Sequence, residues 1–162
     1  MAYNSRVRFC VYQRLPKEKV LSLRIETKAA PDDADFQAIV APLRAYNHAQ
    51  AGMTLAEKVA FVVNDESGVT HGGLHARVFG QWLFIELLVV PESARGEGMG
   101  TKLMHMAEAT AREKGCVGVW LDTFSFQAPD FYQRLGYSVF GELKDYPPGH
   151  SRYFMQKRLD IQ

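Results

Sequence analysis

The chain lacks the features of disulfide-rich, zinc-binding, membrane-spanning and exported proteins. It has 2 cysteines in 162 residues, Cys10 and Cys116, and their spacing matches no zinc motif. We therefore expect free thiols in a cytoplasmic protein rather than a disulfide framework. No apolar run reaches the roughly 18 residues of a membrane helix. The N-terminus also lacks the apolar segment of a signal peptide, so neither a membrane span nor export is predicted.

An excess of charge is missing as well. With 19 basic and 18 acidic residues the formal net charge is +1, which gives no reason to expect nucleic acid or another polyanion as a partner. A basic cluster between Arg6 and Lys19 is interpreted as part of a solvated N-terminal arm over residues 1–19. Because Val7, Phe9 and Val11 alternate with other residues, this arm allows an extra edge strand. Residues 20–162 are predicted to form one domain.

No metal site is expected. His71 and His75 have the i, i+4 spacing of a helical metal motif, but they fall in a segment that is predicted to be a strand. On a strand that spacing separates them by about 13 Å, too far for both to bind one ion.

One stretch, from Ile85 to Met104, organises the rest of the chain. Ile85–Val90 is an apolar run typical of a buried strand, and it is interrupted only by Glu86. Arg95-Gly-Glu-Gly-Met-Gly100 follows, and a helical pattern begins at Met99. A strand, a glycine turn and a helix in this order expose backbone N–H groups at the positive end of a helix dipole. The stretch therefore predicts an anion site, most often one for phosphate.

The glycine spacing excludes two common nucleotide motifs. The glycines run G-x-G-x-G, which is not the Rossmann G-x-G-x-x-G, and no Gly-Lys-Ser/Thr follows as in a P-loop. The R-x-x-G-x-G order instead resembles the pyrophosphate loop of the GNAT superfamily of acetyl-CoA-dependent N-acetyltransferases.

A second motif supports this resemblance. The segment from Gln127 to Tyr137 is similar to the late helix of that family, with matches at Ala128, Phe131, Tyr132, Gly136 and Tyr137. The stretches TFSFQAPDFYQRLGY and DYPPGHSRYFMQKRL resemble one small bacterial subgroup of the family. The resemblance covers residues 20–160 approximately, and it names no substrate.

The hydrophobic periodicity predicts strands joined mostly by short turns, with helical crossovers around the central strand. The expected strands are 20–28, 59–63, 69–78, 82–90, 116–123, 137–143 and 151–159, and the expected helices are 31–49, 99–114 and 128–136. The fold class is α/β (α+β). The resemblance implies a GNAT fold, in which a mixed, mostly antiparallel sheet of six or seven strands is splayed between its fourth and fifth strands and flanked by about four helices.

The resemblance also implies where acetyl-CoA binds as co-substrate. The pantetheine arm pairs with the edge of the fourth strand, and the pyrophosphate sits on the glycine loop. The expected cofactor-binding residues are Leu88, Val89, Val90, Arg95, Gly96, Glu97, Gly98, Met99, Gly100, Thr101, Ser125, Gln127 and Ala128. Ser125 stands where the family often has asparagine, so Gln127 is the alternative contact there.

Acetyl transfer to an amine needs a base for the amine and an acid for the leaving thiolate. Glu86 is the candidate base, because a carboxylate in an apolar strand has its pKa raised by desolvation. Its alternative role is a strand carboxylate satisfied by a neighbouring arginine or tyrosine. Tyr132 is at the position where many family members have a tyrosine that donates to the sulfur, so it is the candidate acid. Its alternative role is a core aromatic.

The acceptor is expected to be a primary amine of a small molecule, which attacks the thioester directly in a ternary complex. Residues that could line its pocket are Tyr46, Asn47, His48, Tyr146 and His150. Two alternatives remain open at this point, namely acetylation of a protein N-terminus or lysine, and a non-catalytic acyl-CoA-binding module. The predicted exposed edge strands and the N-terminal arm are compatible with a homodimer.

Overall fold

A twisted six-stranded sheet forms the body of the molecule in the computed structural model, which describes residues 23–160. The strand order is β1-β2-β3-β4-β6-β5, and only β3 and β4 run parallel. The strands are β1 (Glu57–Asn64), β2 (Thr70–Phe79), β3 (Trp82–Val89), β4 (Gly118–Phe124), β5 (Ser138–Lys144) and β6 (Ser151–Arg158). The helices are α1 (Asp33–Ala51), α2 (Met99–Glu113) and α3 (Pro129–Arg134), and a single 3-10 turn, η1, spans Glu92–Ala94.

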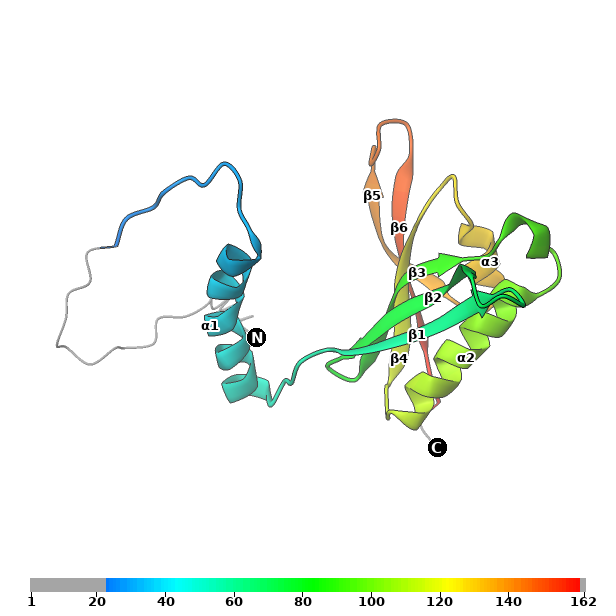
Figure 1. The fold of residues 1–162 in the computed structure, drawn as a ribbon, viewed down its shortest axis with the longest axis horizontal. Coiled ribbons are helices and arrows are strands. Elements are labelled where there is room, and N and C mark those ends of the chain that lie inside the picture. Colours follow the sequence, from blue (N-terminus) through cyan, green and yellow to red (C-terminus); the bar gives the residue numbers. More distant parts are fainter. Residues whose placement is uncertain (1–22, 161–162) are drawn as a thin grey trace, which may run out of the picture.

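The predicted fold class is confirmed, and so are most element positions. Short turns make β1, β2 and β3 an antiparallel meander, and α2 provides the crossover from β3 to the parallel strand β4. Glycines follow the ends of α1, α2 and α3, and Gly52, Gly115 and Gly136 all have the positive φ that such positions favour. Figure 1 shows α2 and α3 on one side of the sheet.

Two expectations about the elements were wrong. A strand was predicted over residues 20–28, but residues 23–28 form no strand, and Leu23 and Ile25 are exposed. Alternating apolar residues form a strand only where an edge is available to pair with, and no described strand pairs with this segment. About four helices were expected, and residues 23–160 contain three α-helices. The reason is that α1 continues to Ala51 and an extended linker then leads directly into β1.

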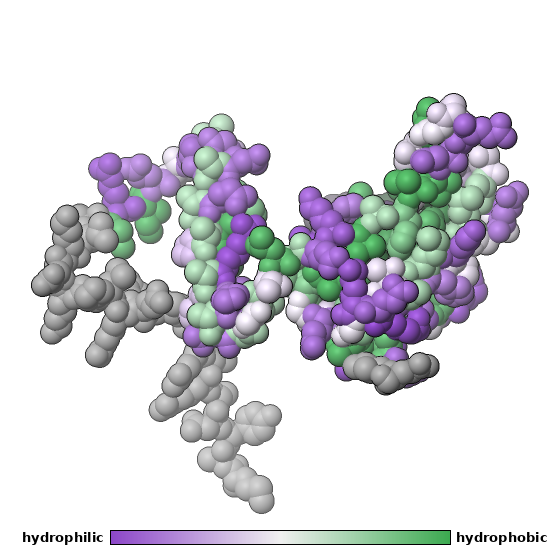
Figure 2. Space-filling model, turned by 60° about the horizontal axis from the view of Figure 1, so that its bottom comes forward, coloured by the Kyte–Doolittle hydropathy of each residue, from purple (hydrophilic) through white to green (hydrophobic). Residues whose placement is uncertain are grey.

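Helix α1 stands apart from the sheet (Figures 1 and 2). It begins with a capping box at Asp32 and Asp35 and ends at the left-handed Gly52, so local signals define both of its ends. None of its residues is buried. The sheet face opposite α2 is therefore not covered by a helix within residues 23–160. No helix in that range is long and apolar enough to cross a membrane.

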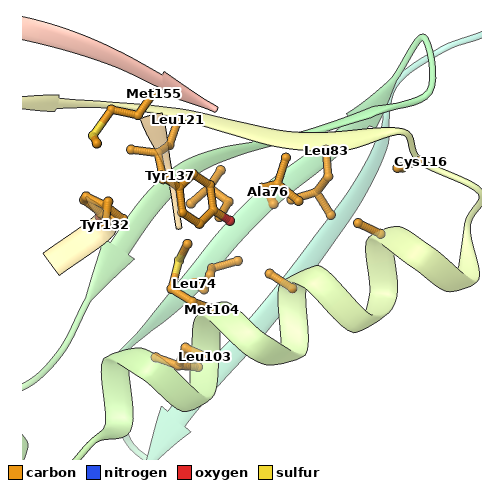
Figure 3. Packing of buried hydrophobic residues seen from close by; sticks show 14 of the residues in the cluster. Leu74, Ala76, Leu83, Leu103, Met104, Cys116, Leu121, Tyr132, Tyr137 and Met155 are labelled. Atoms are coloured by element: carbon orange, nitrogen blue, oxygen red, sulfur yellow. The ribbon is translucent and has the colours of Figure 1, made fainter. Parts of the chain in front are cut away.

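The core lies between α2 and the sheet (Figure 3). Inward-facing residues of the strands, such as Leu74, Leu83 and Leu121, meet Met104 and its neighbours on α2. Tyr132 and Tyr137 also belong to this core, with their ring centroids 6.2 Å apart. Because inward and outward positions alternate along a strand, the residues next to these point to the opposite face of the sheet.

One ion pair is buried against this core. Glu108 of α2 is 3% exposed, and Lys157 of β6 donates to both of its carboxylate oxygens at 2.8 Å. Removing one partner of a buried ion pair strongly destabilises a protein, because the remaining buried charge then has no partner.

We therefore expect Glu108→Leu to lower the free energy of unfolding by about 3 kcal/mol, measured by urea denaturation. Replacing Lys157 by methionine in the same protein should restore most of that loss, since the second partner of Glu108, Arg112 at 3.7 Å, is exposed to solvent and no buried charge is then left unpaired. Glu113→Gln, at the exposed end of the same helix, is the control and should change stability by less than about 0.5 kcal/mol. A Glu108→Leu variant as stable as the control would show that the pair is not structural.

Candidate functional site

A cleft of about 1000 Å³ lies where β3 and β4 separate. The parallel pairing of the two strands runs from Trp82 opposite Gly118 to Ile85 opposite Leu121, and it stops there. Both strands continue beyond this point without pairing to each other. The splay expected between the fourth and fifth predicted strands is therefore present between β3 and β4, whose numbers are lower by one because residues 23–28 do not form the strand predicted at residues 20–28. The cleft is lined by Glu86, Leu87, Leu88, Val89, Val90, Ala94, Arg95, Gly96, Gly98, Met99, Gly100, Thr101, Asp122, Thr123, Phe126, Gln127, Ala128, Phe131, Tyr132 and Arg134.

The cleft thus brings together both predicted catalytic residues and most predicted cofactor residues. Of the thirteen cofactor positions, only Glu97 and Ser125 do not line it. Glu97, within the glycine loop, is exposed to solvent. Ser125 faces the β5–β6 loop instead, where its Oγ accepts a hydrogen bond from the Ser151 N–H at 3.2 Å.

The glycine loop forms one end of the cleft. Gly98 precedes α2 with φ at 79°, and no side chain caps the helix, so its first N–H groups face open space. The side chain of Arg95 folds back toward the loop, where its Nε donates to the Val90 carbonyl at 3.4 Å. A Cβ at Gly100 would lie 3.3 Å from the ring of Phe131, so the glycine there permits close packing of α2 on α3. This end of the cleft is suited to a phosphate group.

Tyr132 projects from α3 into the cleft. Its ring is held by Phe131 and Tyr137, and its residue is 9% exposed. Burial, and next the negative charge of Asp122, raise the pKa of Tyr132 to about 12. The group is therefore a protonated hydroxyl at neutral pH that can donate to a molecule in the cleft.

Glu86 occupies a β-bulge on the opposite wall. His75 pairs with Leu87 and Ala76 with Ile85, so Glu86 has no partner residue on β2. Its carboxylate is not isolated, because Arg77 Nε lies 3.1 Å from Oε1 and His75 Nδ1 lies 2.9 Å from Oε2. The neighbouring arginine that the sequence suggested as a structural partner is present. The histidine was not anticipated.

A second carboxylate in the cleft was also missed from the sequence. Asp122, on β4, accepts from Arg152 of β6 at 2.6 Å. The Arg152 guanidinium lies over the rings of Phe124, Tyr146 and Phe154. The rim of the cleft on this side is therefore an aromatic cluster around one arginine.

The predicted acceptor residues fall into two groups. Tyr146 and His150 belong to the loop between β5 and β6, where the ring of His150 lies edge-on to Phe126 of the cleft, with centroids 5.0 Å apart. They therefore stand beside the cleft without lining it. The α1 residues, Tyr46, Asn47 and His48, lie elsewhere. Asn47 and His48 line a separate hollow of about 270 Å³, together with Phe79 of β2.

Comparisons with known proteins agree with this geometry. The family model described as acetyltransferase (GNAT) family matches residues 22–137. The blasticidin-S acetyltransferase of Streptomyces morookaense is 47% identical over 95 residues, which cover 58% of this chain and 70% of that protein. The acetyltransferase Atu2258 of Agrobacterium fabrum is 39% identical over 129 residues, covering 78% of this chain and 93% of that protein.

A solved structure matches the fold closely. The crystal structure of an acetyltransferase from Agrobacterium tumefaciens superposes with a TM-score of 0.80 at 33% identity, over 85% of this chain and 100% of that chain. The similarity of fold thus extends over most of the chain.

Proposed function

Because the chain belongs to the GNAT family of acetyltransferases, we propose that it transfers the acetyl group of acetyl-CoA to a primary amine of a small molecule. The observation that carries this proposal is the cleft between β3 and β4. It has a phosphate-binding loop at one end and a protonated tyrosine and a paired carboxylate on its walls.

The cleft suggests how acetyl-CoA is held. The pyrophosphate accepts hydrogen bonds from the N–H groups at the start of α2, where Gly96 and Gly98 present no side chain. The pantetheine arm lies along the part of β3 that has left β4, and its amides pair with the free backbone edge near Leu87 and Val89. This placement brings the thioester between Tyr132 and the bulge at Glu86.

Groups in the cleft can perform the three chemical tasks of acetyl transfer. A backbone N–H of β3 near Val89 stabilises the negative charge that develops on the thioester oxygen. The Tyr132 hydroxyl gives its proton to the departing sulfur. Glu86 takes part in removing a proton from the acceptor amine. The amine attacks the carbonyl carbon directly, so both substrates are bound together.

A small molecule is the favoured acceptor because the 47% identical relative is named as acting on blasticidin S. The aromatic rim beside Asp122 suits a compact acceptor with a planar group. Acetylation of a protein N-terminus or lysine is the second candidate. It would be favoured if peptides proved the better acceptors.

The function is tested by thiol release from acetyl-CoA with a panel of acceptors. The panel contains blasticidin S, other small primary amines, and peptides with free N-termini or lysines. We expect at least one small amine to be acetylated with a kcat/KM that exceeds that of every peptide. Transfer to peptides alone would overturn the small-molecule assignment, and no transfer at all would overturn the proposed activity.

The phosphate loop gives a separate prediction. Gly98→Asp introduces a residue type that tolerates positive φ and puts a carboxylate where the pyrophosphate binds. Calorimetry should show acetyl-CoA binding at least tenfold weaker, about 1.4 kcal/mol.

The matched control is Gly68→Asp, in the hairpin between β1 and β2. Its φ of 85° is close to the 79° of Gly98, and at both glycines an added Cβ would have no atom within 4 Å. This variant should bind acetyl-CoA as the wild type does. Equal affinity in both variants would show that the loop is a turn and not a phosphate site.

A further inference from the structure

His75 is the feature of this site that the proposed chemistry has not used. It lies on β2, and its Nδ1 is 2.9 Å from Glu86 Oε2. Arg77, two residues along the same strand, holds the other oxygen through Nε at 3.1 Å. Both oxygens of Glu86 are therefore taken by side chains of β2.

These side chains share the sheet face that α2 does not cover. Leu74, Ala76 and Ile85 are buried in the core against α2. By alternation His75 and Arg77 point the other way, and the bulge turns Glu86 toward them. Figure 1 shows α2 and α3 on the first face. The second face, to which alternation assigns His75, is therefore the one open to an acceptor.

The hydrogen bond to Glu86 determines which nitrogen of His75 carries the proton. An ionised carboxylate only accepts hydrogen bonds, and Glu86 forms an ion pair with Arg77 through its other oxygen. Nδ1 must therefore be the donor, and Nε2 of the neutral ring keeps its lone pair. Among the described residues, no side chain or backbone group bonds to Nε2 of His75, and the side chain is 38% exposed. This is the arrangement in which a carboxylate orients an imidazole base.

We infer that His75 is the general base of the acetyl transfer and that Glu86 is the residue that positions it. This inference rests on the proposed function. His75 then removes the proton from the acceptor amine, a role for which the sequence suggested Glu86 alone. Glu86 lines the cleft and also stabilises the imidazolium as it forms.

The reaction step balances with the groups present. The lone pair of the neutral amine forms the N–C bond to the thioester carbon, and an amine proton passes to His75 Nε2. The C–S bond breaks with its electron pair on sulfur, and sulfur takes the proton of the Tyr132 hydroxyl. The imidazolium and the phenolate then exchange protons with solvent, which restores both groups.

Several charged groups influence the imidazole. Glu86 on β3 lies next to the ring, and Arg77 on β2 holds the other oxygen of that carboxylate. On β1 the residue opposite His75 is the uncharged Ala60, and Lys58, opposite Arg77, adds a second positive charge on this face.

The same strand supplies a matched control. His71 also bonds to a carboxylate, with its Nε2 2.6 Å from Asp65 Oδ2, and its side chain is 50% exposed. Glu86 lines the cleft, and His75 contacts Glu86 from β2 without lining the cleft itself. Neither His71 nor its partner Asp65 lines the cleft. If these histidine–carboxylate pairs only stabilised the sheet, replacing His71 and replacing His75 would have the same effect on activity.

The test compares His75→Gln with His71→Gln, using the best small-amine acceptor of the panel. We expect His75→Gln to lower kcat/KM about 100-fold near neutral pH and to lose the acidic limb of the pH profile. His71→Gln should stay within about threefold of the wild type. Imidazole added to His75→Ala should restore part of the rate, which a structural role would not allow.

Nitrogen-15 NMR of the wild type tests the geometry independently of any acceptor. We expect the neutral His75 ring to carry its proton on Nδ1, and the opposite tautomer would overturn the inference. An active wild type whose rate is unchanged in His75→Gln would overturn the base assignment and leave the proposed function standing. A wild type that acetylates nothing in the panel would overturn the proposed function and the base role with it.

Discussion

Glu86→Gln is expected to reduce activity near neutral pH by about 100-fold or more. Glutamine keeps the size of the side chain but not its charge, so Arg77 and His75 both lose their ionic partner. A glutamine amide can also donate to His75, which would favour the tautomer with the proton on Nε2. Proton removal from the acceptor should fail in either case.

The pH profile separates this role from simple anchoring of the amine. Activity of Glu86→Gln should recover in part at high pH, where more of the acceptor amine is already neutral. If Glu86 only held a charged amine, the variant would instead show a raised acceptor KM across the profile. An unchanged rate and profile would remove Glu86 from the mechanism.

Tyr132→Phe is expected to lower kcat about 100-fold while the KM for acetyl-CoA changes little. Phenylalanine keeps the packing of the ring and removes only the proton donor. Because burial raises the pKa of Tyr132 to about 12, the hydroxyl stays protonated throughout the usual assay range. The fall in kcat of Tyr132→Phe should therefore be seen at every pH below that value.

Tyr137→Phe provides the control for this variant. Its hydroxyl is buried without a hydrogen-bond partner among the described residues, and it does not line the cleft. Removing it should leave kcat within about twofold of the wild type. An unchanged kcat in Tyr132→Phe, measured where chemistry limits turnover, would show that sulfur is protonated by another group.

The parts of the fold that local chemistry determines could be predicted from the sequence. The glycines that end helices, the apolar run of β3 and the late helix all have signals within a few neighbouring residues. The strand expected at residues 20–28 could not be judged this way, because its existence depends on a partner edge elsewhere in the fold.

The site was predictable to the same extent. Residues of the glycine loop and Tyr132 were found from two motifs, whereas Asp122 and its partner Arg152 come from different strands and have no common motif. The partner of Glu86 does have a signal in the sequence. Counting outward from the two-residue turn Gly80–Gln81 places His75 directly opposite Glu86, and the bulge then shifts this register by one.

A crystal structure with acetyl-CoA bound would test most directly that acetyl transfer takes place in the cleft between β3 and β4. We expect the pyrophosphate on the N–H groups around Gly98, and the sulfur within hydrogen-bonding distance of the Tyr132 hydroxyl. The thioester should be open to the sheet face that carries His75 and Glu86. Acetyl-CoA bound outside this cleft, or with its sulfur beyond the reach of Tyr132, would contradict the proposed site.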